Sequence, residues 1–226
     1  IEKYDLVAIP VVDSIGRLVG QITVDDVMDE VREQSERDYQ LASGLSQDVE
    51  MDDSVFRQTS ARLPWLLIGM AGGIGNSMIL GNFDTTFATH PEMALYIPLI
   101  GGTGGNVGTQ SSALVVQGLA NNSLDTKDTF RQIAKEAVVA LINATIISLL
   151  VYIYNFVRFG ATATVTYSVS ISLFAVVMFA SIFGTFVPMT LEKLKIDPAI
   201  ATGPFIAITN DIIGMMLYMG ITVLLS

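Results

Sequence analysis

One acidic residue interrupts the apolar C-terminal stretch of the sequence. Asp211 is the only charged residue between residues 198 and 226. In a helix that begins near residue 199 it lies roughly 18 Å along the axis, near the middle of a membrane. An ionised aspartate at that depth costs at least about 2.5–3.5 kcal/mol unless something solvates or pairs with it. No Lys or Arg occurs in the central part of any apolar run. Three interpretations therefore stay open: a protonated structural carboxyl, a proton relay, or a cation ligand in a water-filled path.

A second stretch is polar and rich in glycine. Residues 101–112 read GGTGGNVGTQSS inside an otherwise apolar run. The spacing of Gly101 from Gly105, and of Gly104 from Gly108, is typical of closely packed membrane helices. Packing alone does not require so many polar side chains in succession, so the stretch also suits irregular backbone beside a wet cavity. Those polar residues are Asn106, Thr109, Gln110, Ser111 and Ser112.

Small residues and a proline flank Asp211 in the sequence. Gly203 and Pro204 precede it by two turns, and we expect them to loosen the helix there. Carbonyl groups freed at that point, or at Ala207, could help to line an ion path. Gly214 leaves room one turn after the aspartate.

Several functional classes are excluded by what the sequence lacks. It has no cysteine and one histidine, His90, which excludes thiol chemistry, disulfides and a histidine metal cluster within one chain. The glycine-rich stretch has Val107 where a dinucleotide-binding motif needs its third glycine, and no Walker A lysine is present. A net charge of −10 argues against nucleic acid as a partner. We therefore do not expect an enzyme.

The elements that must position these residues are membrane helices. The 226 residues are 51% hydrophobic and 15% charged, with a mean hydropathy of +0.54. We expect an all-α membrane protein with five transmembrane helices, since each long apolar run reaches the roughly 20 residues that cross a bilayer. The expected spans are 63–83, 94–120, 134–157, 167–189 and 200–225.

The basic residues near the span ends predict the orientation. One side collects seven cations and the other only Arg158. This bias predicts a cytoplasmic N-terminus, and an odd number of spans then places the C-terminus outside. The seven cations are Arg57, Arg62, Lys127, Arg131, Lys135, Lys193 and Lys195.

The first 62 residues form an acidic head, with fourteen acids and six bases. Their pattern predicts two strands and then a helix capped by Thr23, with Asp25 and Asp26 in its first turn. This unit resembles the second half of a CBS domain, through the PVVD, GRLVG and TVDDV segments. Because the first half is missing, we expect a truncated or processed chain. We expect a partial CBS domain in residues 1–29, an acidic connecting helix and linker in 30–62, and the transmembrane domain in 63–226.

The whole pattern resembles the MgtE family of Mg2+ transporters and channels. The likeness is carried by PLIGGTGGNVGTQS at 98–111, DPAIATGP at 197–204 and NDIIG at 210–214. The five spans, the CBS-like head and the acidic helix fit the same family.

The resemblance implies a homodimer in the cell membrane with an ion path between the copies, lined by the second and fifth spans. Asp211 matches the family's pore aspartate. Mg2+ suits such a site, because one or two carboxylates and carbonyls can hold it while it keeps its waters. Carbonyls around Ala207 and the side chain of Asn106 could contact those waters. The other expected pore-lining residues are Gly104, Gly105, Thr109, Gly203, Pro204 and Gly214.

The resemblance also implies that the head senses cytoplasmic Mg2+. Family ligand positions match Asp5, Asp26, Asp29, Asp38 and, before the last span, Asp197. Where relatives carry further acids, this sequence has Gln34 and Arg37. Two other functions stay open: an ion-coupled carrier that uses Asp211, and a CBS-bearing membrane receptor that transports nothing.

Overall fold

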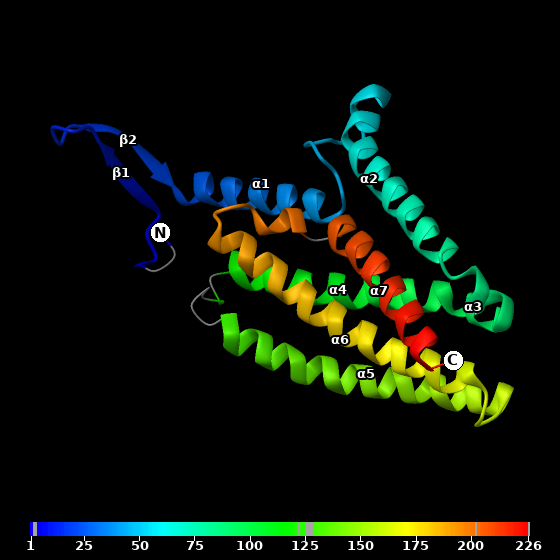
Figure 1. Ribbon diagram of the computed structural model, residues 1–226. Coiled ribbons are helices and arrows are strands. Elements are labelled where there is room, and N and C mark those ends of the chain that lie inside the picture. The colour runs from blue at the N-terminus through cyan, green and yellow to red at the C-terminus, as the bar shows by residue number, and fades with distance from the viewer. Residues whose placement is uncertain (2–3, 122, 125–128, 202, 226) are drawn as a thin grey trace. The chain divides into compact units, whose positions relative to one another are not determined.

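The computed structural model describes residues 1, 4–121, 123–124, 129–201 and 203–225 (Figure 1). Lys127, which contributes to the predicted orientation, lies outside the described residues. The chain divides into two compact units, Ile1–Gln40 and Leu41–Ser226.

The first unit begins with a β-hairpin, as the sequence predicts. Strands β1 (Ala8–Val12) and β2 (Leu18–Thr23) are antiparallel, and their turn is held by the Asp13 carboxylate, which accepts hydrogen bonds from two backbone N–H groups. Helix α1 (Val24–Ala42) follows. The Thr23 hydroxyl accepts a hydrogen bond from the Asp26 backbone N–H at 3.3 Å, which confirms the predicted cap. No residue of either strand is buried.

The second unit is helical. Its long helices are α2 (Val55–Gly81), α4 (Ile97–Ala120), α5 (Thr129–Phe159), α6 (Thr164–Lys193) and α7 (Pro204–Leu225). Its short helices are α3 (Asp84–Thr89), η2 (Pro91–Tyr96) and η4 (Pro198–Ala201).

Four of the five expected spans have the length and composition of membrane helices: α2, α5, α6 and α7. Helix α4 has 24 residues, but its glycines and polar side chains keep its mean hydropathy below that of a membrane span. The fifth span therefore stays a prediction. A polar helix of this kind is stable in a membrane when its polar face lies against protein or water.

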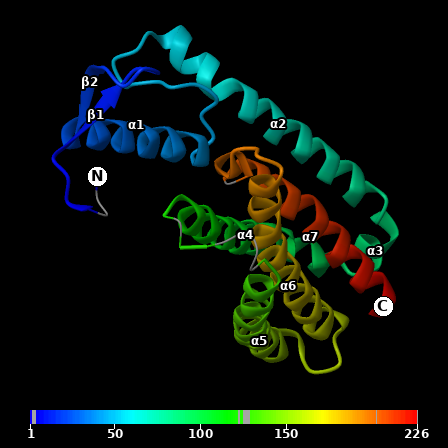
Figure 2. The same ribbon diagram turned by 90° about the vertical axis from the view of Figure 1, so that its left-hand side faces the viewer.

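Helix α6 is the centre of the second unit. It contacts α4, α5 and α7, and Figure 1 shows α5 running alongside it. In Figure 2, α2 runs beside α7, and it is the least buried of the four candidate spans. The outer face of α2 therefore has no neighbour among the described helices of this chain.

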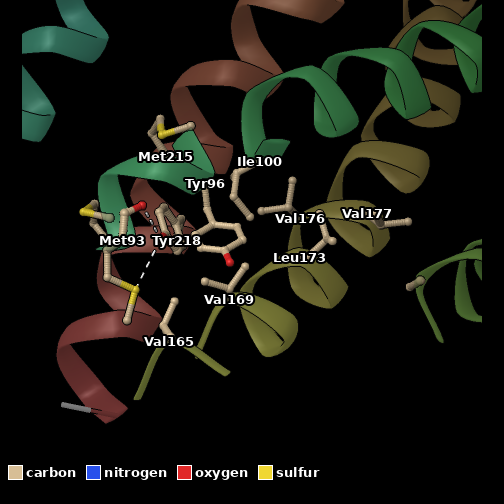
Figure 3. Packing of buried hydrophobic residues seen from close by; sticks show 12 residues of the cluster. Met93, Tyr96, Ile100, Val165, Val169, Leu173, Val176, Val177, Met215 and Tyr218 are labelled. Carbon is tan, nitrogen blue, oxygen red and sulfur yellow. Dashed lines mark hydrogen bonds between the residues drawn. The ribbon is translucent and has the colours of Figure 1, made fainter. Parts of the chain in front are cut away.

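A hydrophobic cluster joins α4, α6 and α7 near the start of α4 (Figure 3). Val169, Leu173 and Val176 of α6 pack there against Ile100 and Tyr218. The Tyr218 hydroxyl donates a hydrogen bond to the backbone carbonyl of Met93 at 2.8 Å. Tyr218 thus ties α7 to the segment that precedes α4, and this fixes the two helices that carry the polar motifs.

Candidate cation site

Asp211 of α7 faces α4 across two glycines. A β-carbon on Gly101 would lie 3.4 Å from the carboxylate oxygen Oδ1, and one on Gly105 would lie 3.5 Å from it. The two glycines are one turn apart on α4 and so form a flat strip. The carboxylate can approach the helix because neither position carries a side chain.

An open cavity of about 390 Å³ lies beside the carboxylate. Asp211 and Ala207 border it from α7, and Gly105, Asn106 and Thr109 border it from α4. The sequence analysis expected these five residues at the ion path from two separate stretches of the chain, and in the structure they border one cavity. The remaining lining residues are Asn76, Leu80, Ile97, Pro98, Gly101, Gly102 and Met215.

Asn76 is a cavity residue that sequence reasoning missed. It belongs to α2, and its side-chain oxygen Oδ1 is buried with no hydrogen-bond partner among the described residues. A buried amide oxygen without a partner is costly. The residue borders the cavity, although the Oδ1 atom itself is shielded from solvent. An asparagine in the middle of an apolar run was the signal that could have found it.

Asn210, the neighbour of Asp211, points away from the cavity. The residue is 1% exposed, and neither polar atom of its side chain has a partner in the described part of the chain. It lies against Gly108 of α4, where even a β-carbon would overlap its amide group. These adjacent residues of α7 therefore have different surroundings. Asp211 faces the cavity, and Asn210 packs between α7 and α4 against Gly108.

The other expected pore-lining residues lie elsewhere. Gly104 and Gly214 are buried against Val176 of α6, where added β-carbons would lie 2.9 and 3.4 Å from its Cγ1 atom. In this structure they permit helix packing and do not border the cavity.

Pro204 begins α7 and does not interrupt it, so the expected loosening of the helix is not observed. A proline at the first helical position needs no N–H partner and fits the helical φ. The Gly203 carbonyl accepts a hydrogen bond from the Ala207 N–H at 3.0 Å. That carbonyl is therefore occupied by the helix.

Ser111, near the end of the polar stretch of α4, belongs to a second cluster of polar side chains away from the cavity. The Ser111 hydroxyl donates to Glu136 of α5 at 2.7 Å and lies 3.1 Å from the Ser181 hydroxyl of α6, which also donates to Glu136. These contacts connect three helices and leave Ser111 turned away from the cavity. Glu136 was missed because it stands at the edge of an apolar run beside Lys135, where a solvated charge is the simpler interpretation.

The predicted sensor acids make local contacts. Asp26 accepts hydrogen bonds from the backbone N–H and the hydroxyl of Thr23, and these bonds lower the pKa of Asp26 below its ordinary value. Asp38 accepts a hydrogen bond from Gln34 at 2.7 Å. Asp197 accepts one from the Ala199 N–H at 2.8 Å, at the start of η4.

The remaining two sensor acids lie in the first unit. Asp5 is exposed and has a positive φ of 50°, and Asp29 lies on α1. Within each unit, no three described Asp, Glu or His side chains come close enough to hold an ion together. The head ligands stay predictions.

Comparison with known proteins decides the family. The MgtE family of divalent cation transporters matches residues 97–221, which include both polar motifs and the α4 and α7 residues that border the cavity. The chain belongs to the MgtE family. The resemblance seen in the sequence is thus confirmed, and a family of transporters is not a class of enzymes.

Three curated MgtE proteins are similar over 98% of this chain, and all three are named magnesium transporter MgtE. The Bacillus subtilis protein is 35% identical over 221 residues. The Thermus thermophilus protein is 33% identical over 228 residues, and the Enterococcus faecalis protein 30% over 221. The aligned part covers 48–49% of these relatives, so this chain spans about half of their length.

Proposed function

We propose that this chain conducts Mg2+ across the cell membrane through a pore formed by two copies, with Asp211 as the central ion ligand. The observation that carries the proposal is the Asp211 carboxylate, which lies beside an open cavity and against two glycines. No ion pair of the described residues involves Asp211. The names of the three relatives support Mg2+ as the transported ion.

A second copy would complete the cavity. One carboxylate and a few polar groups of α2, α4 and α7 border it, and it is not enclosed by this chain. A two-fold axis through that opening would bring a second Asp211 to the same path. Two facing carboxylates repel each other unless a cation lies between them. This proposal includes α4 as the fifth membrane span, since its polar face would then lie along the ion path.

The ligand chemistry favours a hydrated divalent cation. Mg2+ gives up its water slowly and is commonly held by one or two carboxylates with several waters still attached. Asn106, Thr109 and Asn76 border the same cavity and could accept or donate hydrogen bonds to those waters. The family resemblance also implies the Ala207 carbonyl as a ligand; it lies within α7, so it would bind through the lone pair that the helical hydrogen bond leaves free.

We further propose a cytoplasmic N-terminus and regulation by cytoplasmic Mg2+. The charge bias at the helix ends supports the orientation. The acids that match family ligand positions would hold the regulatory ions: Asp5, Asp26, Asp29, Asp38 and Asp197. An ion that binds only one state stabilises that state in proportion to RT ln(1 + [L]/Kd).

The test is Mg2+ uptake into liposomes that contain the purified chain and an enclosed Mg2+-sensitive dye. We expect uptake that follows the Mg2+ gradient and persists when proton and Na+ gradients are removed. Uptake that requires one of those gradients would favour the ion-coupled carrier. No uptake above that of empty liposomes would favour the receptor.

A further inference from the structure

A second cavity, of about 670 Å³, lies between α2 and α7. Its α2 wall consists of Arg62, Trp65, Leu66, Gly69 and Met70. These residues recur at intervals of one, three and four, so they form one face of the helix. The wall is apolar except at Arg62, which marks one end of it.

The opposite wall is also mainly apolar. Pro204, Ala207 and Ile208 border the cavity from α7 at the same helical spacing. Gly44 closes one end, where its positive φ of 80° suits glycine and a β-carbon would lie 2.6 Å from the Pro204 ring. Ala207 borders both this cavity and the one beside Asp211.

Along the α2 wall a basic residue comes first and apolar residues follow, which matches the headgroup and the acyl chain of a lipid in a bilayer. From Arg62 to the end of α2 at Gly81, the helix rises about 28 Å, close to the thickness of the hydrocarbon core. Arg62 therefore lies at the membrane surface and Trp65 one turn deeper, where tryptophan is favoured. Met70 lies about 12 Å below Arg62, among the acyl chains.

The charge of Arg62 has no acidic partner among the described residues. Its guanidinium donates to the Gln58 amide oxygen at 3.4 Å, and none of the ion pairs includes it. Arg57, in contrast, forms an ion pair with Asp53 at 2.9 Å. Helix α2 contains no Asp or Glu, so the α2 face of a second copy would offer Arg62 no acidic partner.

We propose that this groove binds a phospholipid with an anionic headgroup. The headgroup phosphate contacts Arg62, and one acyl chain lies along Trp65, Leu66 and Met70. A basic residue at the membrane surface and an apolar groove below it together match the two halves of such a lipid. The proposal goes beyond ion conduction and requires only that the chain spans a membrane.

Trp65 is the only tryptophan of the chain, so its fluorescence reports on the groove directly. The full chain is placed in phosphatidylcholine vesicles in which a rising fraction of lipid carries brominated acyl chains, which quench tryptophan. We expect brominated phosphatidylglycerol to quench Trp65 at about one fifth of the mole fraction that brominated phosphatidylcholine needs. Arg62→Gln should remove this preference, and Arg57→Gln should leave it intact.

A second variant separates the groove from the charge. A β-carbon on Gly69 meets only the Ile208 Cδ1 atom, at 3.8 Å, and Gly69 borders the groove, so we expect the rest of a leucine side chain to extend into the groove. Gly69→Leu should abolish the preference although Arg62 is unchanged. Equal quenching by both brominated lipids, or a preference that survives Arg62→Gln, would overturn the proposal. Crosslinking between copies through Leu66→Cys, with no quenching by either lipid, would instead assign the groove to a second copy.

Discussion

Asp211 and Gly105 meet so closely that a β-carbon on Gly105 would lie 3.5 Å from the carboxylate oxygen Oδ1. The distance is an ordinary van der Waals contact, so an alanine fits at this position without a clash. Its methyl group would, however, displace water or ligand from one side of the carboxylate. We predict that Gly105→Ala retains the fold and reduces Mg2+ uptake, and parallel thermal-unfolding and uptake measurements on one preparation check both.

Gly108, three residues later, should respond in the opposite way. A β-carbon there would overlap the Asn210 amide and lie 2.9 Å from the Ile206 Cγ2 atom. We predict that Gly108→Ala destabilises the fold by about 1–3 kcal/mol, the usual cost of overpacking. Gly102→Ala is the matched control, because nothing lies within 4 Å of that position and alanine favours the helix. Equal unfolding temperatures for the two variants would contradict the described contact between α4 and α7.

Asn76 should affect uptake without affecting the fold. Asn76 borders the cavity and its Oδ1 atom has no hydrogen-bond partner among the described residues, so we expect its amide group to turn toward an ion-bound water when an ion is present. We predict that Asn76→Leu lowers Mg2+ uptake, since an apolar side chain cannot replace that bond. Ser77→Leu, on an exposed neighbouring position of α2, should leave uptake unchanged. Similar uptake by both variants would remove Asn76 from the site.

The proposed dimer predicts a crosslink at the cavity mouth. Gly102 borders the cavity and has open space around it, and the chain contains no cysteine of its own. We predict that Gly102→Cys joins two copies under mild oxidation, as judged by gel electrophoresis. Leu150→Cys on the exposed face of α5 is the control and should stay monomeric. A monomer that still conducts Mg2+ would defeat the dimeric pore.

Asp26 gives a prediction about pH. Its hydrogen bonds to Thr23 favour the ionised carboxylate and lower its folded-state pKa below the ordinary value for aspartate. The contribution of this carboxylate to the cap is therefore complete above the unfolded pKa and is lost as the pH falls through the folded pKa. An NMR titration of the Asp26 carboxyl group should show a lower midpoint in the parent than in Thr23→Ala. An unchanged midpoint in Thr23→Ala would show that the Thr23 hydroxyl does not stabilise the charge.

The sequence predicted the parts of this structure that depend on local physics. Long apolar runs, the Thr23 cap and the polar stretch of α4 follow from hydropathy, propensity and spacing. The cavity could be anticipated because an aspartate within an apolar helix needs solvation. Local sequence patterns do not predict which face of a helix packs against which neighbouring helix.

Gly104 and Gly105 illustrate this limit. They are adjacent and chemically identical, yet Gly105 faces Asp211 and Gly104 faces Val176 of α6. The choice depends on the rotation of α4 about its axis, which is set by packing against α6 and α7. The same reason explains why Asn76 and Glu136 were missed, since their partners or neighbours lie on helices distant in sequence.

The central claim is that Asp211 binds the conducted ion, and the most direct measurement is Mg2+ uptake by Asp211→Asn in liposomes. Asparagine keeps the shape and one carbonyl oxygen but removes the charge. We predict that uptake falls at least about tenfold, equivalent to about 1.4 kcal/mol of lost ion stabilisation. The unfolding temperature should stay equal or rise, because a charge is removed from an apolar helix. Asp84→Asn controls for the loss of a carboxylate elsewhere. Near-parental uptake by Asp211→Asn would contradict the account and leave Asp211 as a structural carboxyl.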